Sequence, residues 1–407
     1  MAEIKPDIET FAKIKVVGVG GSGNSVVNRM IDAKIRGVEY IVINTDVQAL
    51  HISKASQKLH IGKNVTRGLG AGMDPEMGKK AAEESQNEIR DLLKGTDMVF
   101  ITCGLGGGTG SGAAPIVAEI AKDLGALSIA VVTKPFSFEG VKRSEIAEEA
   151  LDELSDKVDS IIVVPNDKLL EIIDKKTSLL DAFAVSDNIL KQGVGGIAEL
   201  ITVPGLINVD FADVKAIVED AGTSLMGVGE AKGEDRATKA AKMAIENSLL
   251  DLSIDGAQGI LFTITGSPDL TMYEVHEAAK IITQSGDPEA KVIFGAIIDE
   301  KLKDSVRVTV VATGFNTSIK KGFTNNVTPF EEKEDFAMPE IKEEEDFFAK
   351  EKEDVSDGGH EKKKKKSIFI QDTPSEKGDE EVENIIENDT EDDELDIPAF
   401  LRKKMQK

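Results

Sequence analysis

The chain has 407 residues, enough for two domains and a tail, and 40% of them are apolar. Its net charge of −25 is uneven, because residues 331–396 carry 27 acidic and 10 basic side chains and contribute −17. The mildly acidic body lacks the basic face that non-specific nucleic-acid binding requires, so we expect no nucleic-acid partner. A single cysteine, Cys103, excludes an internal disulfide framework, and no apolar run approaches the ~18 residues of a membrane span. We therefore expect a cytoplasmic protein.

Pattern and composition divide the chain into six consecutive parts. Strands alternate with helices in the first half, which is typical of a three-layered α/β fold with a parallel sheet, and a smaller α/β unit follows a long helix. The parts are a polar N-terminal extension (1–12), a first α/β domain (13–176), a central helix (177–205), a second α/β domain (206–315), a linker whose acidic composition predicts disorder (316–395) and a terminal peptide (396–407).

The first predicted strand, Ile14–Val19, runs into a glycine-rich turn and then a helical pattern. Gly18, Gly20 and Gly23 match the GxGxxG pattern of dinucleotide-binding folds. Asp46 follows the next predicted strand, about 20 positions further on, where a nicotinamide dinucleotide site would use an acid on the ribose. An NAD-dependent oxidoreductase is therefore one alternative.

A second arrangement of strand, glycines and helix begins at the predicted strand Met98–Thr102. Six glycines lie within the nine positions 104–112, and an apolar helical pattern follows at Ile116–Leu124. Glycine lets the backbone approach a ligand closely, and the N–H groups of a helix N-terminus bind phosphate. We favour an anion site over a mobile loop, where so many glycines would be an unrewarded entropic cost. Residues 62–76 form another glycine-rich loop, which we expect to be a third wall of the site.

Both glycine loops leave the carboxyl ends of strands, where ligands bind in a parallel sheet. Two loops at one crevice suit a polyphosphate, and no GxxxxGK[ST] sequence of P-loop enzymes is present. An NAD site would use only the first loop and would leave residues 104–112 unexplained. Cys103 has no histidine nearby in the sequence, so we expect it to be a small packed residue and not a nucleophile.

The terminal peptide regains an amphipathic pattern at Asp396–Met405. Ile397, Phe400 and Leu401 share one helical face beside basic residues, at the end of a tether of about 80 residues. Such a peptide is typical of a docking motif, and a frayed terminus is the alternative. We expect the run Lys362–Lys366 to be a solvated charge block, with a membrane or nucleic-acid patch as its alternative.

The stretch Gly106-Gly-Gly-Thr-Gly-Ser-Gly112 resembles the signature of the tubulin/FtsZ family, whose members include the bacterial cell-division GTPase. Supporting stretches are residues 18–24, 68–72, 133–140, 166–168, 208–213 and 396–401. The resemblance covers roughly residues 12–315 and the last dozen. It implies a Rossmann-like GTPase domain at 13–176, an activation domain at 206–315, GTP and GDP as ligands, and Mg²⁺ on the phosphates without a protein metal site.

The resemblance also implies individual roles for the nucleotide-binding residues. The first phosphate loop would be Gly20, Gly21, Gly23 and Asn24, a γ-phosphate sensor Ala71 and Gly72, and the main phosphate loop Gly107, Gly108, Thr109 and Gly110. Glu139 and Arg143 would contact the ribose and the α-phosphate side, with an ordinary surface ion pair as the alternative. Asn166 and Asp187 would read guanine, and Phe183 would stack on the base, although from the residue alone core packing is favoured.

None of these loops supplies an obvious catalytic base. Asn208, Asp210 and Asp213 lie in the second domain, where residue type alone predicts that Asp210 and Asp213 cap the helix Phe211–Glu219. The resemblance implies instead that the acids orient water on the GTP of the next subunit, so that hydrolysis requires head-to-tail assembly. It also implies membrane-anchor and regulatory partners for Asp396–Lys407 and a mid-cell ring location. A non-catalytic, nucleotide-gated scaffold is the second alternative.

Overall fold

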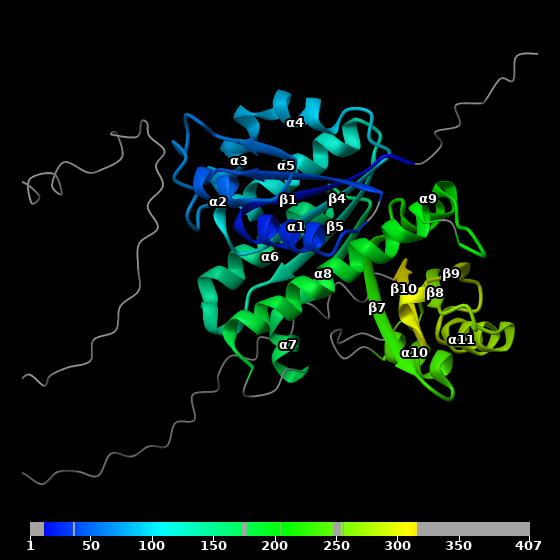
Figure 1. Ribbon diagram of the computed structural model, residues 1–407. Helices are drawn as coiled ribbons and strands as arrows, with labels where there is room; N and C mark the ends of the chain where they lie inside the picture. The colour runs from blue at the N-terminus through cyan, green and yellow to red at the C-terminus, as the bar shows by residue number, and fades with distance from the viewer. Residues whose placement is uncertain are drawn as a thin grey trace, which may run out of the picture. The chain divides into compact units, whose positions relative to one another are not determined.

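The computed structural model describes residues 12–315, apart from residues 36, 173–176, 204, 247–253 and 255. The predicted extension, linker and terminal peptide lie outside the described residues, so those predictions are untested. The described strands form one ten-stranded sheet in the order β3-β2-β1-β4-β5-β6-β7-β10-β8-β9 (Figure 1). In the described part of the chain, no helix has the length and apolar character needed to cross a membrane.

The first half of the sheet is parallel, as the alternating pattern predicts. Its strands are β1 (Ile14–Val19), β2 (Val38–Asn44), β3 (Gln57–His60), β4 (Met98–Gly104), β5 (Leu127–Lys134) and β6 (Ser160–Pro165). The inner strands are continuous apolar runs because helices cover both of their faces. In β1, Val17 and Val19 pack on one side and Ile14 and Val16 on the other.

Two groups of helices make these two faces of the core. One face packs against helices α3, α4, α5 and α6, and the other against α1, α2, α8 and α9 (Figure 1). Their bounds are α1 (Gly20–Asp32), α2 (Val47–Ile52), α3 (Pro75–Glu84), α4 (Gln86–Leu93), α5 (Gly108–Asp123), α6 (Val141–Ser155), α7 (Asn166–Ile172), α8 (Leu179–Thr202) and α9 (Phe211–Val218). A short 3-10 helix, η1 (Ser137–Glu139), precedes α6.

Helix α5 begins eight residues earlier than the apolar pattern at Ile116 predicts. The glycine-rich segment forms the first turns of α5, and tight packing of α3 against it requires residues without a side chain. A Cβ on Gly112 would lie 1.9 Å from the carbonyl oxygen of Pro75. The long helix α8 is confirmed, and so is the prediction that its glycines permit close packing. A Cβ on Gly196 would lie 2.8 Å from Cγ2 of Thr309.

The second half contains β7 (Gly222–Lys232), α10 (Arg236–Ile245), β8 (Gly259–Gly266), α11 (Met272–Ser285), β9 (Lys291–Ile298), the 3-10 helix η2 (Glu300–Leu302) and β10 (Ser305–Thr313). Strand β7 was not predicted. Its start pairs in parallel with β6, and most of its length pairs antiparallel with β10, so the sheet continues from one half into the other. Gly227 and Gly229 interrupt the apolar pattern by which a strand is predicted. Glycine is required at both positions, because carbonyl oxygens of α10 lie within 2.0 Å of where a Cβ atom would be.

Candidate nucleotide site

Two helices begin at the carboxyl ends of the central strands without a capping side chain. Helix α1 starts directly after β1, at Gly20 with a φ of +74°, and α5 starts after its N-cap residue Gly107. By contrast, the carboxylates of Asp46 and Asp74 cap α2 and α3. The free N–H groups and the positive end of the dipole make an uncapped helix start an anion site.

The predicted glycines bring these two helix starts together. A Cβ on Gly20 would lie 3.0 Å from the backbone nitrogen of Gly110, and one on Gly23 would lie 2.4 Å from the carbonyl oxygen of Thr102. Gly21 and Gly107 are different, because nothing lies within 4 Å of a Cβ built on either residue. Gly20, Gly23 and Gly110 therefore serve close packing, and Gly21 and Gly107 border open space that a phosphate could fill.

The glycine-rich loop predicted at residues 62–76 contacts the start of α5, and it ends at residue 74 because α3 begins at Pro75. The Gly108 N–H donates a hydrogen bond to the Gly72 carbonyl at 2.8 Å, and a Cβ on Gly108 would lie 2.8 Å from the Ala71 carbonyl oxygen. The proposed γ-phosphate sensor, Ala71 and Gly72, therefore contacts the start of α5 directly.

A cavity of about 290 Å³ lies beside the two loops and gathers four of the predicted site residues. They come from separate elements: Glu139 from η1, Arg143 from α6, Asn166 from the start of α7 and Asp187 from α8. Ser22, Gly104, Thr133 and Ser186 also line it, and sequence reasoning did not select them. Ser22 and Gly104 belong to the glycine-rich segments, and Thr133 is the second-last residue of β5, so their position near the carboxyl end of a strand is the sequence signal that could have indicated them. Phe183 lies in α8, one turn before Asp187, and its side chain is outside the described residues.

Glu139 and Arg143 form an ion pair with an Oε2–Nη1 distance of 3.0 Å. The Phe136 N–H donates to the other carboxylate oxygen of Glu139 at 2.9 Å, which fixes this side chain at the cavity wall. The Nε of Arg143 is buried, and no atom of the described residues accepts its hydrogen bond. In an ordinary surface ion pair, a buried N–H donor would normally have a hydrogen-bond partner. The unmet hydrogen bond of Arg143 Nε therefore favours a guanidinium whose remaining partner is a ligand.

The two predicted guanine-reading residues are held by neighbours. The Ser186 hydroxyl donates to Oδ1 of Asn166 at 2.9 Å, and Arg29 Nε lies 2.6 Å from Oδ2 of Asp187. Burial raises the pKa of the Asp187 carboxyl, and Arg29 opposes that rise through its charge and hydrogen bond. Asn24 is also buried, and both polar atoms of its amide lack a partner among the described residues.

Other side chains near the loops have roles that the sequence left open. Cys103 is buried, which confirms the packing prediction, and burial raises the pKa of its thiol to about 12. The Thr45 and Thr109 hydroxyls lie 2.6 Å apart. Asp46, the candidate ribose ligand of a dinucleotide site, instead accepts hydrogen bonds from the Gln48 and Ala49 N–H groups at the start of α2.

The three predicted catalytic residues lie at the far end of α8 from the cavity. Asp187 precedes the last residue of α8, Thr202, by about 22 Å at the usual helical rise, and Asn208, Asp210 and Asp213 follow that end. The Asp213 N–H donates to Asp210 Oδ1 at 2.8 Å, so the two acids cap α9, as residue type predicts. The Gly205 N–H donates to Asn208 Oδ1 at 2.6 Å.

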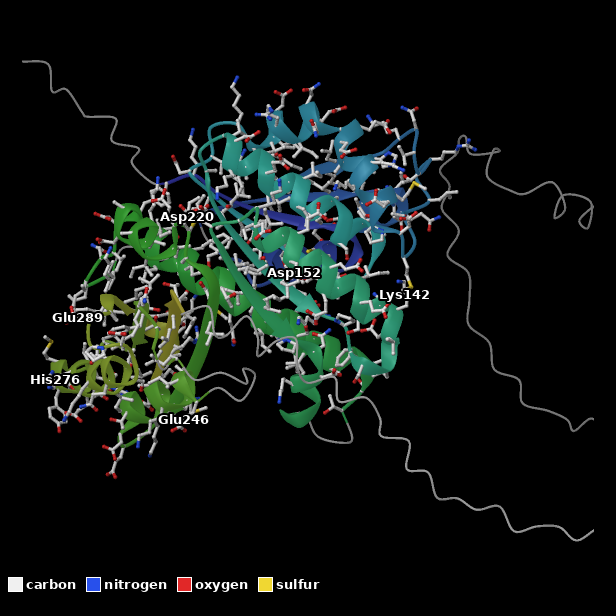
Figure 2. The ribbon with its side chains drawn as sticks, turned by 180° about the vertical axis from the view of Figure 1, so that it is seen from behind. Lys142, Asp152, Asp220, Glu246, His276 and Glu289 are labelled. Atoms are coloured by element: carbon white, nitrogen blue, oxygen red, sulfur yellow. The ribbon has the colours of Figure 1, made fainter. Side chains whose placement is uncertain are left out.

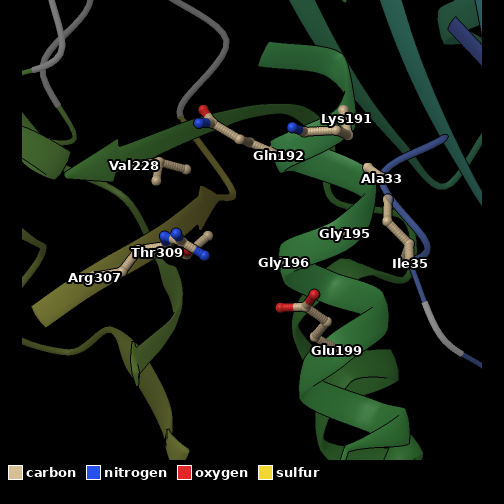
Figure 3. A pocket seen from close by; sticks show the side chains of 10 residues that line it. All are labelled: Ala33, Ile35, Lys191, Gln192, Gly195, Gly196, Glu199, Val228, Arg307 and Thr309. Atoms are coloured by element: carbon tan, nitrogen blue, oxygen red, sulfur yellow. The ribbon is translucent and has the colours of Figure 1, made fainter. Parts of the chain in front are cut away.

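A second cavity, of about 210 Å³, lies between α8 and strands β7 and β10 (Figure 3). Ala33, the C-cap residue of α1, lines it, so this cavity lies at the negative end of that helix dipole. Its carboxylate, Glu199, has a pKa raised by burial, and Arg307 opposes the rise. This end of α1 does not suit a phosphate.

The described residues contain no group of three or more His, Cys, Asp or Glu side chains close enough to hold a metal ion. His276 projects outward from α11 (Figure 2). A cation in the nucleotide cavity would therefore depend on the ligand's own oxygens for most of its coordination.

Comparisons with known proteins match both halves of the chain. A family model described as the Tubulin/FtsZ family, GTPase domain, matches residues 13–174, and one described as the FtsZ family, C-terminal domain, matches residues 222–316. A solved structure of an empty FtsZ dimer from M. jannaschii is 50% identical, covers 75% of this chain and 89% of its own, and has a TM-score of 0.72. A mutant FtsZ of M. jannaschii has the same identity and TM-score and is covered over 92% of its length.

A more distant structure has the same fold. CetZ2 from Haloferax volcanii, solved as a GTPγS-bound protofilament, is 21% identical to this chain, with a TM-score of 0.65. The match covers 76% of this chain and 96% of CetZ2.

Proposed function

We propose, from the premise that this chain belongs to the tubulin/FtsZ family of GTPases, that it assembles head to tail into filaments and hydrolyses GTP between adjacent subunits. Membership of the family makes the chain a GTPase. The oxidoreductase and the non-catalytic scaffold, the two alternatives left open by the sequence, are therefore wrong.

The nucleotide would lie across the two uncapped helix starts, with its base toward α8. Gly20, Gly21, Gly107, Thr109 and their neighbours would surround the phosphates, where no side chain caps either helix start. Glu139 and Arg143 would hold the ribose and α-phosphate side, and Asn166 and Asp187 would contact the nucleoside. Asn24, whose buried amide has no partner among the described residues, would belong to the first phosphate loop. A carboxylate at Asp187 pairs with the adjacent N1–H and amino group of guanine, which adenine lacks.

One observation carries the assembly proposal: the candidate acids follow the carboxyl end of α8, and the nucleotide cavity borders its amino-terminal half. Asp210 and Asp213 follow its carboxyl end, and Asp187 lies in its amino-terminal half. A single chain cannot bring both groups to one phosphate. A second copy placed head to tail can, because its α9 start would meet the first copy's cavity. Asp210 and Asp213 would then orient the attacking water, and Asn208 would support the loop that carries them.

The surfaces at the two ends suit such a contact. Leu69, Met73 and Phe138 are exposed on the loops around the nucleotide site, and Leu206 is exposed two residues before Asn208. Large apolar side chains exposed at both ends of a head-to-tail axis are typical of an interface. The FtsZ dimer of M. jannaschii and the CetZ2 protofilament support the same proposal.

Mg²⁺ would neutralise phosphate charge during hydrolysis. The two carboxylates that line the cavity, Glu139 and Asp187, are each paired with an arginine, and no metal-binding cluster exists among the described residues. This lining suits an ion held mainly by phosphate and water. Of the chain's own residues, Thr109 at the start of α5 would supply a hydroxyl oxygen near the phosphates. We also propose that Asp396–Lys407, outside the described residues, docks membrane-anchor and regulatory proteins at a division ring in the cytoplasm.

A concentration series with a mixing experiment tests the split site. GTP hydrolysis per subunit should rise steeply at the protein concentration where light scattering reports assembly, and a constant rate per subunit would contradict the proposal. Asp213→Ala keeps the nucleotide cavity but lacks one of the catalytic acids, and Asp187→Ala keeps the acids but lacks the residue that would read guanine. Each variant alone should therefore be nearly inactive. Mixed in equal amounts, about a quarter of the interfaces would join two intact halves, and hydrolysis should return in proportion. Activity in the mixture no higher than in the separate variants would overturn the split site.

A further inference from the structure

Thr45 and Thr109 form a buried hydroxyl pair beside the phosphate loop. Their Oγ1 atoms are 2.6 Å apart, and the exposed fractions are 0% for Thr45 and 9% for Thr109. Thr45 directly follows β2, and Thr109 is the second residue of α5. Each hydroxyl has one proton to donate, and either atom can be the donor in this pair.

The backbone at Thr45 is also bound to the glycine-rich loop 62–74. The Gly70 N–H donates to the Thr45 carbonyl oxygen at 3.4 Å. The Thr66 hydroxyl lies 3.4 Å from the same oxygen and 3.1 Å from the Gly62 carbonyl oxygen, its closer acceptor. The next residue, Asp46, forms an antiparallel bridge with Leu69. Thr45 therefore contacts the phosphate loop with its side chain and the glycine-rich loop with its main chain.

The same loop has a second attachment to the phosphate cradle, at Gly72. Its carbonyl accepts the Gly108 N–H at 2.8 Å, and that N–H belongs to the start of α5. A phosphate at this helix start competes for the Gly108 N–H and repels the carbonyl oxygen. Once the bond to Gly72 is given up, Thr45 remains as a connection between the cradle and a loop that exposes 88% of Leu69.

We propose that the Thr45–Thr109 hydroxyl pair is a relay through which phosphate occupancy at α5 sets the position of loop 62–74 and its exposed Leu69. Thr45 is a positioning residue for the GTPase, acting through Thr109. When Thr109 donates its proton to a phosphate oxygen, only Thr45 can donate within the pair, and its hydroxyl becomes fixed in one direction. Without the phosphate, both directions are open and the end of β2 is held less firmly.

This proposal rests on the proposed nucleotide site and assembly, and three variants separate the two levels. Thr45→Val removes the hydroxyl and keeps the shape, and Thr45→Ser restores the hydroxyl. The matched control is Ser160→Ala, which breaks another buried hydroxyl pair, Ser160–Ser224 at 2.7 Å, at the β6–β7 junction far from the phosphate loops. All three are measured as the full chain with GTP and with GDP.

The readouts are GTP affinity below the assembly concentration, the assembly threshold, and hydrogen exchange in residues 62–74. Thr45→Val should bind GTP within about threefold of the parent, because Thr45 reaches the phosphates only through Thr109. Its assembly threshold in GTP should rise about five- to tenfold, the effect of one lost buried hydrogen bond. The difference in loop exchange between GTP and GDP should disappear. Thr45→Ser should restore both properties.

Each failure has a distinct meaning. If the parent neither binds GTP nor assembles, the proposed function is wrong. If the parent does both and Thr45→Val matches Ser160→Ala in threshold and exchange, the relay is wrong. A Thr45→Val protein that keeps the parent's exchange difference between GTP and GDP, or a Thr45→Ser protein that rescues nothing, also overturns it.

Discussion

Helices α5 and α9 start with nearly the same backbone geometry and opposite chemistry. The N-cap residue of α5, Gly107, has φ −96° and ψ 170°, and that of α9, Asp210, has φ −85° and ψ 168°. Gly107 leaves the helix N–H groups to an outside partner. Asp210 fills its own helix start, and the Asp210 N–H in turn donates to Asp213 at 3.4 Å. One start is ready for an anion, and the other already presents two carboxylates.

This difference teaches how one fold could make two halves of a site. An open helix start attracts phosphate, and a start that carries its own acids repels it. The acid-capped start suits the water side of a phosphoryl transfer and not the phosphate side. Because α9 follows the carboxyl end of α8 and the nucleotide cavity borders its amino-terminal half, the two starts could complement each other only between copies. Each prediction below changes one side of this comparison.

The largest effect should come from giving α5 the cap that α9 has. Gly107→Asp fits, because the backbone there is extended and nothing lies within 4 Å of a new Cβ. The carboxylate should cap α5, but because glycine is itself a fair N-cap residue the free energy of unfolding should rise by only about 0.3 kcal/mol. It should also repel the phosphates by about 4 kcal/mol, roughly a thousandfold loss of GTP affinity. Denaturant melts and a nucleotide-binding titration measure the two quantities.

Gly107→Ala is the neutral control for this substitution. It adds the Cβ without the charge, so its loss of GTP affinity measures the steric part of the substitution alone and should be far smaller than that of Gly107→Asp. If Gly107→Asp bound GTP as tightly as Gly107→Ala, the phosphates would not lie at the start of α5.

The next largest effect should come from neutralising an acid on the other side. Asp213→Asn keeps the Asp213 N–H that binds Asp210 and an oxygen for the reciprocal bond, so the cap of α9 should survive. We expect GTP binding to be unchanged and hydrolysis in assembled protein to fall about a hundredfold, the usual loss when one positioned group is removed. Phosphate release and a GTP titration on the same sample separate the two.

Asp287→Asn is the control, because this acid also accepts a backbone N–H, from Glu289 at 2.8 Å, and lies in a loop of the same half. Its hydrolysis should match that of the parent. Normal hydrolysis by Asp213→Asn would leave capping as the role of Asp213.

The comparison of helix starts also explains what the sequence could predict. Glycine crowding after an apolar strand has few uses other than anion binding, so the sequence indicates both glycine loops as candidates. The structure places both at the carboxyl ends of the neighbouring parallel strands β1 and β4. The sequence did not indicate the early start of α5, because its first turns consist largely of glycine, which has a low helix propensity. Glycine is required there because Pro75 packs too closely against Gly112 to admit a Cβ atom. The contact between Thr45 and Thr109 joins residues 64 positions apart, so no local pattern could indicate it.

The smallest predicted effect concerns pH at the nucleoside end of the site. Burial raises the pKa of Asp187, and Arg29 limits the rise. Guanine reading would need the ionised carboxylate, so GTP affinity should fall as the pH falls through this raised pKa. Arg29→Met removes the opposing charge, raises the pKa further and moves the loss to higher pH. Between about pH 7 and pH 5 the variant should lose roughly three- to tenfold more affinity than the parent.

The sign for folding is opposite, which gives the prediction an internal check. A carboxyl whose pKa is raised in the folded state stabilises the protein below its unfolded pKa, and this stabilisation is lost as the pH rises through the folded pKa. Arg29→Met should therefore lose more stability than the parent as the pH rises, while its GTP affinity improves. Asp187→Asn has no group to titrate there, so its affinity should be flat over the same range. If Arg29→Met and the parent showed superimposable affinity profiles, Asp187 would not be the group that reads the base.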